Sequence, residues 1–166
     1  MIRPSRTDDH AFIVHSILKS FSFSHWAGVL DQDTFWTSHR TLLEGLLQKR
    51  GVHVDIYANP EDDKHILAFL VREDAEIPIA HSLYVKHAFR DHKAADEKPR
   101  IALKLLRHAG MADGKRFEFT FRTAAWDRYR QRHRLNAHFA PELLRGTRKD
   151  RNADQAREVR QGRTTG

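Results

Sequence analysis

Residues 84–106 read YVKHAFRDHKAADEKPRIALKLL and join a strand pattern to a helix pattern across a long polar turn. Apolar residues recur at helical spacing after the turn, from Ile101 to Leu106. A turn that ends a strand and opens a helix favours anion binding, because free N–H groups and the positive end of the helix dipole meet there. Lys93 stands in this turn, where close approach of the backbone to an anion would need glycine. The stretch predicts an α/β fold and raises the question of whether the turn still holds a phosphate.

The period of the apolar residues predicts the elements around this stretch. Before it we expect a strand at residues 2–4, a helix capped by residues 5–9, a second helix over about 33–50, and strands at 52–57, 65–73 and 80–86. After it we expect a helix at 99–109, a strand at 116–123, a basic helix at 124–134 and a short strand at 137–140. Phe117, Phe119 and Phe121 are expected on one core face of their strand.

Length and composition restrict the class of protein. A chain of 166 residues is expected to form one domain with its own core. It has no cysteine, which excludes disulfides and thiolate metal sites. The first ten residues lack the apolar core of a signal peptide, and no apolar run has the length of a bilayer span. We therefore expect a soluble protein, intracellular at synthesis, with no membrane association.

Positive charge is concentrated in the last third of the chain. The net charge is +7, yet residues 1–114 hold 15 Lys and Arg against 16 Asp and Glu. Apolar periodicity ends near Pro141, which divides the chain into a domain at 1–140 and a basic tail at 141–166. Such a tail cannot bury enough apolar surface to order itself. We expect it to be disordered in the free subunit and to order on an acidic partner, either nucleic acid or an acidic protein surface.

The predicted order of one strand, two helices, three strands, helix, strand, helix and strand resembles the GNAT acetyltransferase superfamily from Ile2 to about Phe139. The resemblance implies a mixed, mostly antiparallel central sheet flanked by helices. In that family the turn has the pattern R/Q-x-x-G-x-G/A, and its amides hold the coenzyme A pyrophosphate. Arg90 and Ala95 match, but Lys93 replaces the glycine and residues 96–100 interrupt the helix start. For an enzyme the cofactor-binding residues would be Val85, Arg90, His92, Lys93, Ala94 and Ala95. With this turn we expect coenzyme A to bind weakly or not at all.

The resemblance also suggests catalytic residues. The family pattern A-x-x-x-Y-x-x-x-G-F is matched by Ala125 and Tyr129, while His133 and Arg134 replace its last two positions. Tyr129 could protonate a departing thiolate, or it could simply be an amphipathic helix residue. Glu73 lies in the region where such enzymes sometimes place a general base. The twelve histidines show no zinc-site spacing, and we expect no metal and mostly surface histidines, His81 and His87 included.

A second resemblance points away from catalysis. Residues 2–28, with ILAFLV and LYVKHAFR further on, resemble GNAT-like proteins encoded among the virion genes of tailed bacteriophages. This implies a non-catalytic structural protein without cofactor, made in the host bacterial cytoplasm and located in the virion. A head-to-tail adaptor or connector would form an oligomeric ring, contact a portal-like ring and tail proteins, and lie near DNA without sequence specificity. Its partner-binding residues would be Trp26, Arg145, Arg148, Lys149, Arg151, Arg157, Arg160 and Arg163. Trp26 is expected to pack over the core or, if the protein is a ring subunit, to be covered by a neighbouring subunit.

Three hypotheses from different classes follow. The first is the non-catalytic virion connector, which accounts for the altered turn and the charge distribution together. The alternative is an acyl-CoA-dependent N-acetyltransferase in which Arg90, His92 or Lys93 binds phosphate through its side chain. The third is a nucleic-acid binder using the arginines from 128 to 163, without a known reading motif. The sequence favours the first.

Overall fold

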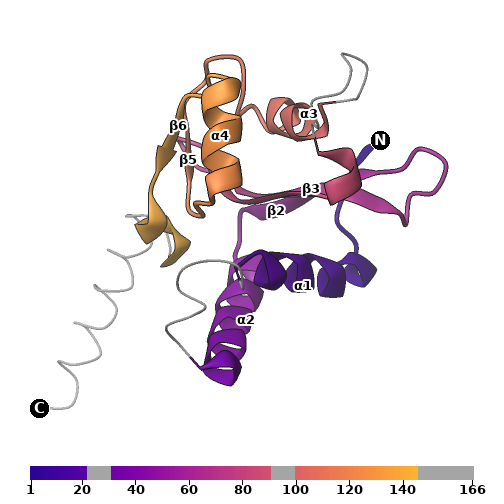
Figure 1. The fold of residues 1–166 in the computed structure, drawn as a ribbon, viewed down its shortest axis with the longest axis vertical. Helices are drawn as coiled ribbons and strands as arrows, with labels where there is room; N and C mark the ends of the chain where they lie inside the picture. Colours follow the sequence, from indigo (N-terminus) through magenta and orange to yellow (C-terminus); the bar gives the residue numbers. More distant parts are fainter. Residues whose placement is uncertain (22–30, 91–99, 146–166) are drawn as a thin grey trace, which may run out of the picture.

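One mixed sheet with two helices on each face makes up the part of the chain that the computed structural model describes, residues 1–21, 31–90 and 100–145 (Figure 1). The strands are β1 (Ile2–Pro4), β2 (Val52–Ala58), β3 (Ile66–Glu73), β4 (Ile79–Val85), β5 (Phe117–Phe119) and β6 (Ala137–Phe139). The helices are α1 (His10–Phe21), α2 (Gln32–Gln48), α3 (Ile101–His108) and α4 (Ala124–Arg132). Short 3₁₀ helices lie at Thr7–Asp9, His87–Phe89 and Pro141–Arg145.

The sheet has the strand order β1-β2-β3-β4-β5-β6. The first three pairings are antiparallel, whereas β4 with β5 and β5 with β6 are parallel. This confirms the predicted fold class, a mixed and mostly antiparallel sheet flanked by helices, and the predicted order of the elements. Within residues 1–21, 31–90 and 100–145, no helix combines the length and apolar composition that crossing a bilayer requires.

The core consists of two apolar layers on opposite faces of β3. Leu70 packs in the layer that includes α3, and Phe69 in the layer that includes α1 and α2. Both side chains are fully buried. A central strand covered on both faces needs apolar residues at successive positions, which is why residues 66–71 form an uninterrupted apolar run. The sheet therefore separates two helical layers (Figure 1).

The predicted strand at 116–123 is shorter in the structure, and the expectation that its three phenylalanines share a face is wrong for Phe121. Phe117 and Phe119 pack in the α3 layer, whereas Phe121 packs in the α1 layer with its ring 4.5 Å from that of Phe21. The physical reason is the loss of a strand partner: β5 is paired with β4 only through Glu118 and Phe119. Beyond that point the alternation of a strand no longer fixes which face a side chain takes.

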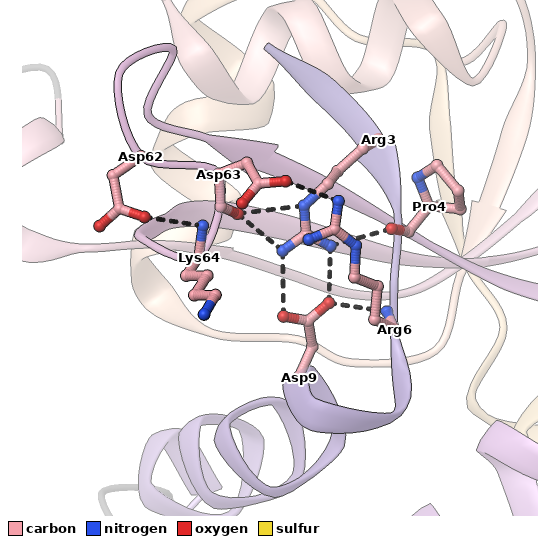
Figure 2. Close-up of polar contacts among 7 residues, drawn as sticks. All are labelled: Arg3, Pro4, Arg6, Asp9, Asp62, Asp63 and Lys64. Atoms are coloured by element: carbon pink, nitrogen blue, oxygen red, sulfur yellow. Dashed lines mark hydrogen bonds and ion pairs between the residues drawn. The ribbon is translucent and has the colours of Figure 1, made fainter.

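A buried ion pair joins the N-terminus to the β2–β3 hairpin, as Figure 2 shows. Arg3 binds both carboxylate oxygens of Asp9, at 2.6 and 3.0 Å, and also donates to the backbone carbonyls of Asp63 and Pro4. Asp9 accepts a further bond of 2.7 Å from the Arg6 N–H. Arg3 and Asp9 are only 8% and 7% exposed. The hydrogen bond from Arg3, which outweighs the cost of burial, holds the pKa of Asp9 below its usual value.

The last described residues pack against the sheet. Leu143, in the 3₁₀ helix Pro141–Arg145, is buried with Ile79 and Ala140. The boundary at residue 140 and the ordering of the tail on a partner stay predictions, because residues 146–166 lie outside the described part.

Candidate functional site

The strands β4 and β5 part in the middle of the sheet. They are paired only from Ile79 to Ala80, and Thr120 N–H donates to the Ala80 carbonyl at 3.1 Å just beyond β5. A bulge lies at the same place, because Ala80 is opposite Arg72 while Ser82 is opposite Val71. His81 is the extra residue of this bulge. β4 therefore continues beside β3 to Val85, while the chain after β5 leaves the sheet.

The register of β4 fixes the direction of its backbone groups. Lys86 N–H donates to the Leu67 carbonyl at 2.9 Å, so every second residue before Lys86 is bonded to β3. Leu83 and Val85 are the residues in between, opposite Leu70 and Ala68. Their N–H and C=O groups point to the side where β5 has parted from β4. Arg90 Nε already donates to the Val85 carbonyl at 2.9 Å.

A cleft of about 1000 Å³ occupies this parting. Its walls come from β4, from the first residues of α3, from α4 and from α1. Among its β4 residues, Leu83 and Val85 pack with the α3 layer and Tyr84 packs with the α1 layer. The cleft is therefore lined by residues from both faces of the sheet.

Helix α4 contributes five residues to the cleft lining, at positions 125, 126, 128, 129 and 132. Tyr129 is half-buried, and its ring stacks on that of Trp126 at 6.2 Å. Arg128 and Arg132 are exposed, and within the described ranges neither has an ion-pair partner. None of the described lining residues is an aspartate or a glutamate. The cleft is thus cationic and fits an anionic ligand.

A buried network of polar side chains lies at the bulge beside the cleft. His81 is fully buried; its Nε2 lies 3.1 Å from Glu73 Oε2 and its Nδ1 lies 3.1 Å from Thr120 Oγ1. The other carboxylate oxygen of Glu73 accepts from Lys49 Nζ at 2.8 Å. The expectation of a surface histidine is wrong here, because partners on β3 and after β5 satisfy the imidazole. These hydrogen bonds join β3, β4 and the end of β5 at the point where β4 and β5 separate.

Glu73 is 4% exposed and is not among the described cleft-lining residues. Burial raises its pKa, but the hydrogen bonds from His81 and Lys49 outweigh burial, and its pKa lies below the usual value. Such a carboxylate is a weak base at neutral pH. The geometry supports a structural role for Glu73, and its role as the general base stays a prediction.

Replacing Glu73 by glutamine is expected to destabilise the fold by about 1–3 kcal/mol at pH 7, because a neutral amide cannot accept charged bonds from both neighbours. The pKa of Glu73 in the folded protein lies below its usual value of 4.5, so its ionised carboxylate stabilises the fold above that pH. This stabilisation is lost as the pH falls through the pKa that Glu73 has in the folded protein. The difference in free energy of unfolding between Glu73→Gln and the wild type should therefore become smaller at acidic pH. Urea unfolding from pH 7 to pH 3 measures it, with Glu118→Gln, whose carboxylate pairs loosely with Arg116 at 3.6 Å, as the control.

The structure brings together only part of the predicted site. Val85, Arg90 and Tyr129 line one cleft. Arg145 ends the last 3₁₀ helix. Within the described ranges no group of three His, Asp or Glu could hold a metal ion. The remaining predicted residues lie outside the described part: Trp26, His92, Lys93, Ala94, Ala95, Arg148, Lys149, Arg151, Arg157, Arg160 and Arg163.

Sequence reasoning missed the cleft role of Arg128 and Arg132, which it had placed among the arginines of a nucleic-acid hypothesis. The signal was their spacing: Arg128 comes one residue before Tyr129 and Arg132 three residues after it. On a helix, this spacing places all three side chains on one face.

No protein-family profile and no curated protein sequence matches the chain. Solved structures do match. A candidate acetyl transferase from Pyrococcus furiosus is 16% identical over 80% of this chain and 90% of that chain, with a TM-score of 0.53. A protein of Clostridium difficile 630 described as a possible acetyltransferase is 18% identical over 66% and 68%, with a TM-score of 0.44. A GNAT-family acetyltransferase candidate from Staphylococcus aureus is 16% identical over 84% and 97%, with a TM-score of 0.43. The chain is thus structurally similar to GNAT-family acetyltransferases; the first of these matches shows that its fold is GNAT-like.

Proposed function

We propose that the cleft binds an acyl-coenzyme A and that the protein transfers the acyl group to an amine. The observation that carries this proposal is the parting of β4 and β5 at the His81 bulge. Because β5 no longer pairs with β4 there, the backbone N–H and C=O groups of Leu83 and Val85 face the cleft. Residues from both faces of the sheet line this cleft. An extended amide-containing chain, such as the pantetheine arm, can bind there as an added strand through main-chain hydrogen bonds.

Cationic side chains beside this strand edge fit the phosphates of the same ligand. Arg90 follows β4, and Arg128 and Arg132 lie on the α4 wall. Guanidinium groups bind phosphate through paired N–H donors, so they can supply contacts that a turn without glycine offers poorly. The expectation of weak or absent binding considered only the turn, which lies within residues 91–99 outside the described part. The α4 arginines favour binding despite Lys93.

The reaction forms a bond from the amine nitrogen to the thioester carbonyl carbon and breaks the carbon–sulfur bond. Coenzyme A supplies the activated acyl group; the attacking amine nitrogen loses one proton and the departing thiolate gains one, so the reaction consumes no net proton. Tyr129 lines the cleft with its ring held against Trp126, and a phenol there can donate that proton.

Replacing Arg128 or Arg132 by alanine is expected to weaken acetyl-CoA binding about tenfold each, the value of one charge-assisted contact near solvent. The loss should shrink at high salt, because exposed charges are screened. Titration calorimetry measures both effects. Arg40→Ala is the control, since Arg40 is an exposed arginine on α2 that pairs with Glu44 and is not among the lining residues. Absence of acetyl-CoA binding to the wild type at millimolar concentration would overturn the proposed function.

The virion connector stays a prediction, together with its ring, its portal-like and tail-protein partners, its place in the virion and its proximity to DNA. The same calorimetry separates the two functions, because a connector without cofactor needs no affinity for acetyl-CoA. Tight binding would favour acyl transfer.

A further inference from the structure

Four aromatic side chains line the cleft on the α1 face of the sheet: Phe12, Phe21, Tyr84 and Phe121. Each is half-buried and packs against the core layer that includes α1 and α2. The ring of Phe12 meets that of Tyr84 edge-on at 6.0 Å, and the ring of Phe21 meets that of Phe121 at 4.5 Å. These two ring pairs form the aromatic wall of the cleft, against which an apolar group of a ligand can pack.

The opposite face of the cleft carries the side chains that the proposed function assigns to the cofactor. Trp126 and Tyr129 pack with the α3 layer, and Arg128 lines the cleft from the same helix. The aromatic wall comes from other elements, namely α1, β4 and the residues just after β5. It therefore lies across the open edge of β4 from the proposed proton donor.

The orientation of a bound thioester decides which substrate reaches the aromatic wall. An arm that binds as an added strand forms its hydrogen bonds to Leu83 and Val85 in the plane of the sheet, so its amide planes lie close to that plane. A thioester that continues the arm then turns its two carbonyl faces toward the two helical layers. A nucleophile approaches a carbonyl carbon through one of these faces. Tyr129 lies on the α3 face, which leaves the α1 face, with its aromatic wall, for the amine.

The acyl group lies in the plane of the thioester and therefore takes a different direction. Arg90, proposed to bind phosphate, follows β4, so the arm runs from there back toward the bulge at His81. Just beyond the bulge, β5 pairs with β4 again through Ala80 and Phe119. This pairing closes the plane of the sheet, so the end of the arm accepts a short acyl group. The aromatic wall is then a surface for the acceptor.

We infer that the acyl acceptor is a primary amine carried on an apolar, preferably aromatic, group, and that this group packs against the aromatic wall. The inference rests on the proposed acyl transfer. The neutral amine forms the bond to the carbonyl carbon and its nitrogen gives up one proton to solvent. The carbon–sulfur bond breaks with its electron pair on sulfur, which takes a proton from Tyr129.

Amines that differ in their carbon chain test the acceptor class. Phenethylamine, butylamine, ethylamine and ethanolamine are compared by thiol release from acetyl-CoA with the wild type, and each kcat/KM refers to the concentration of neutral amine, since the amines differ in basicity. We expect kcat/KM for phenethylamine to exceed that for ethylamine by about tenfold to a hundredfold, because the wall removes a ring from water. Butylamine should lie between them, and ethanolamine should not exceed ethylamine. Equal values for the four amines, or a preference for ethanolamine, would overturn the inference and leave acyl transfer intact.

The acyl group is tested against the same wall. Phenylacetyl-CoA replaces acetyl-CoA, with ethylamine as the acceptor. The added ring should not raise kcat/KM, because the pairing of β5 with β4 closes the end of the cleft that the acyl group enters. A gain of about tenfold or more, the value of burying a ring, would assign the aromatic wall to the acyl group and overturn the inference.

Phe121→Ala tests the contact itself. It is expected to raise KM for phenethylamine about tenfold and to change KM for ethylamine far less, because only the larger acceptor reaches the ring. The matched control is Phe139→Ala, since Phe139 is 45% exposed on β6 and is not among the lining residues. Equal losses for the two amines would contradict the assigned contact. The comparison of amines with the wild type tests the inference even if Phe121→Ala does not fold.

Calorimetry with acetyl-CoA keeps the two proposals distinguishable. Binding of acetyl-CoA together with thiol release that does not depend on the apolar group of the amine would refute the acceptor class alone. Absence of acetyl-CoA binding, together with absence of thiol release for all four amines, would refute acyl transfer and the acceptor class with it. Binding of acetyl-CoA with preferred turnover of phenethylamine is the result that we expect.

Discussion

Replacing Asp9 by alanine is expected to lower the free energy of unfolding by about 3–5 kcal/mol, because it leaves a buried guanidinium without its carboxylate. Arg3 keeps its bonds to the Asp63 and Pro4 carbonyls, but these neutral acceptors do not offset a buried positive charge. The pair also joins β1, the start of α1 and the β2–β3 hairpin, so three segments lose a common contact (Figure 2). Urea unfolding at pH 7 measures the change.

The exposed pair beside it supplies the control. Arg6 binds the Asp63 carboxylate at 2.6 Å, with side chains 52% and 38% exposed. Arg6→Ala should cost no more than about 1 kcal/mol, because solvent screens such a pair. Equal effects of the two substitutions would show that burial does not set the strength of the Arg3–Asp9 pair.

At low pH the Arg3–Asp9 ion pair should no longer contribute to the free energy of unfolding. Arg3 and the Arg6 N–H lower the pKa of Asp9 from 3.8, so the pair contributes stability above that pH and loses it as the pH falls through the folded value. The stability difference between wild type and Asp9→Asn should therefore narrow below about pH 4. A difference that stays constant down to pH 2 would contradict the assigned ion pair.

The sequence predicted the order of the elements because local patterns carry that information. The run at residues 66–71 predicts a central strand covered on both faces, and the spacing from Ile101 to Leu106 predicts α3. Gly51, at φ +85°, ends the connection from α2 to β2, as its position after an apolar helix indicates. These features depend on neighbours within a few residues.

Features that depend on distant partners could not be predicted. The alternation HSLYVK gives no sign that His81 is a bulge residue, since its partners are 8 and 39 positions away in the chain. Asp9 looked like a helix-capping residue, although its main partner is Arg3 in β1. The parting of β4 and β5 likewise depends on the register of two strands and cannot be read from either alone.

The altered turn at residues 91–99 illustrates the same limit for function. Judged alone, Lys93 in place of glycine argues against phosphate binding. The sequence could not show that Arg128 and Arg132, on a helix far along the chain, line the same cleft as Arg90. The affinity of a site assembled from several elements depends on the side chains that all of these elements contribute.

Replacing Tyr129 by phenylalanine is expected to lower kcat for acyl transfer by about 10²–10⁴-fold, the range of a lost general acid, while acetyl-CoA affinity stays unchanged. The ring and its stacking on Trp126 remain in this variant, so the cleft keeps its shape. Thiol release measures kcat, and calorimetry checks affinity. Tyr57→Phe, a change of the same kind on β2 and outside the cleft lining, should leave both values unaltered.

The pH dependence separates proton donation from a merely structural role of Tyr129. A thiol loses its proton with a pKa of about 8.5, so at higher pH the departing thiolate is stable without a donor. The defect of Tyr129→Phe should therefore shrink as the pH rises above that value, since the wild-type hydroxyl no longer confers an advantage on the leaving group. A lost packing contact would give a deficit that does not depend on pH. A constant deficit between pH 7 and pH 9.5, or a kcat above half of the wild-type value at pH 7, would refute the assignment of Tyr129 as the general acid.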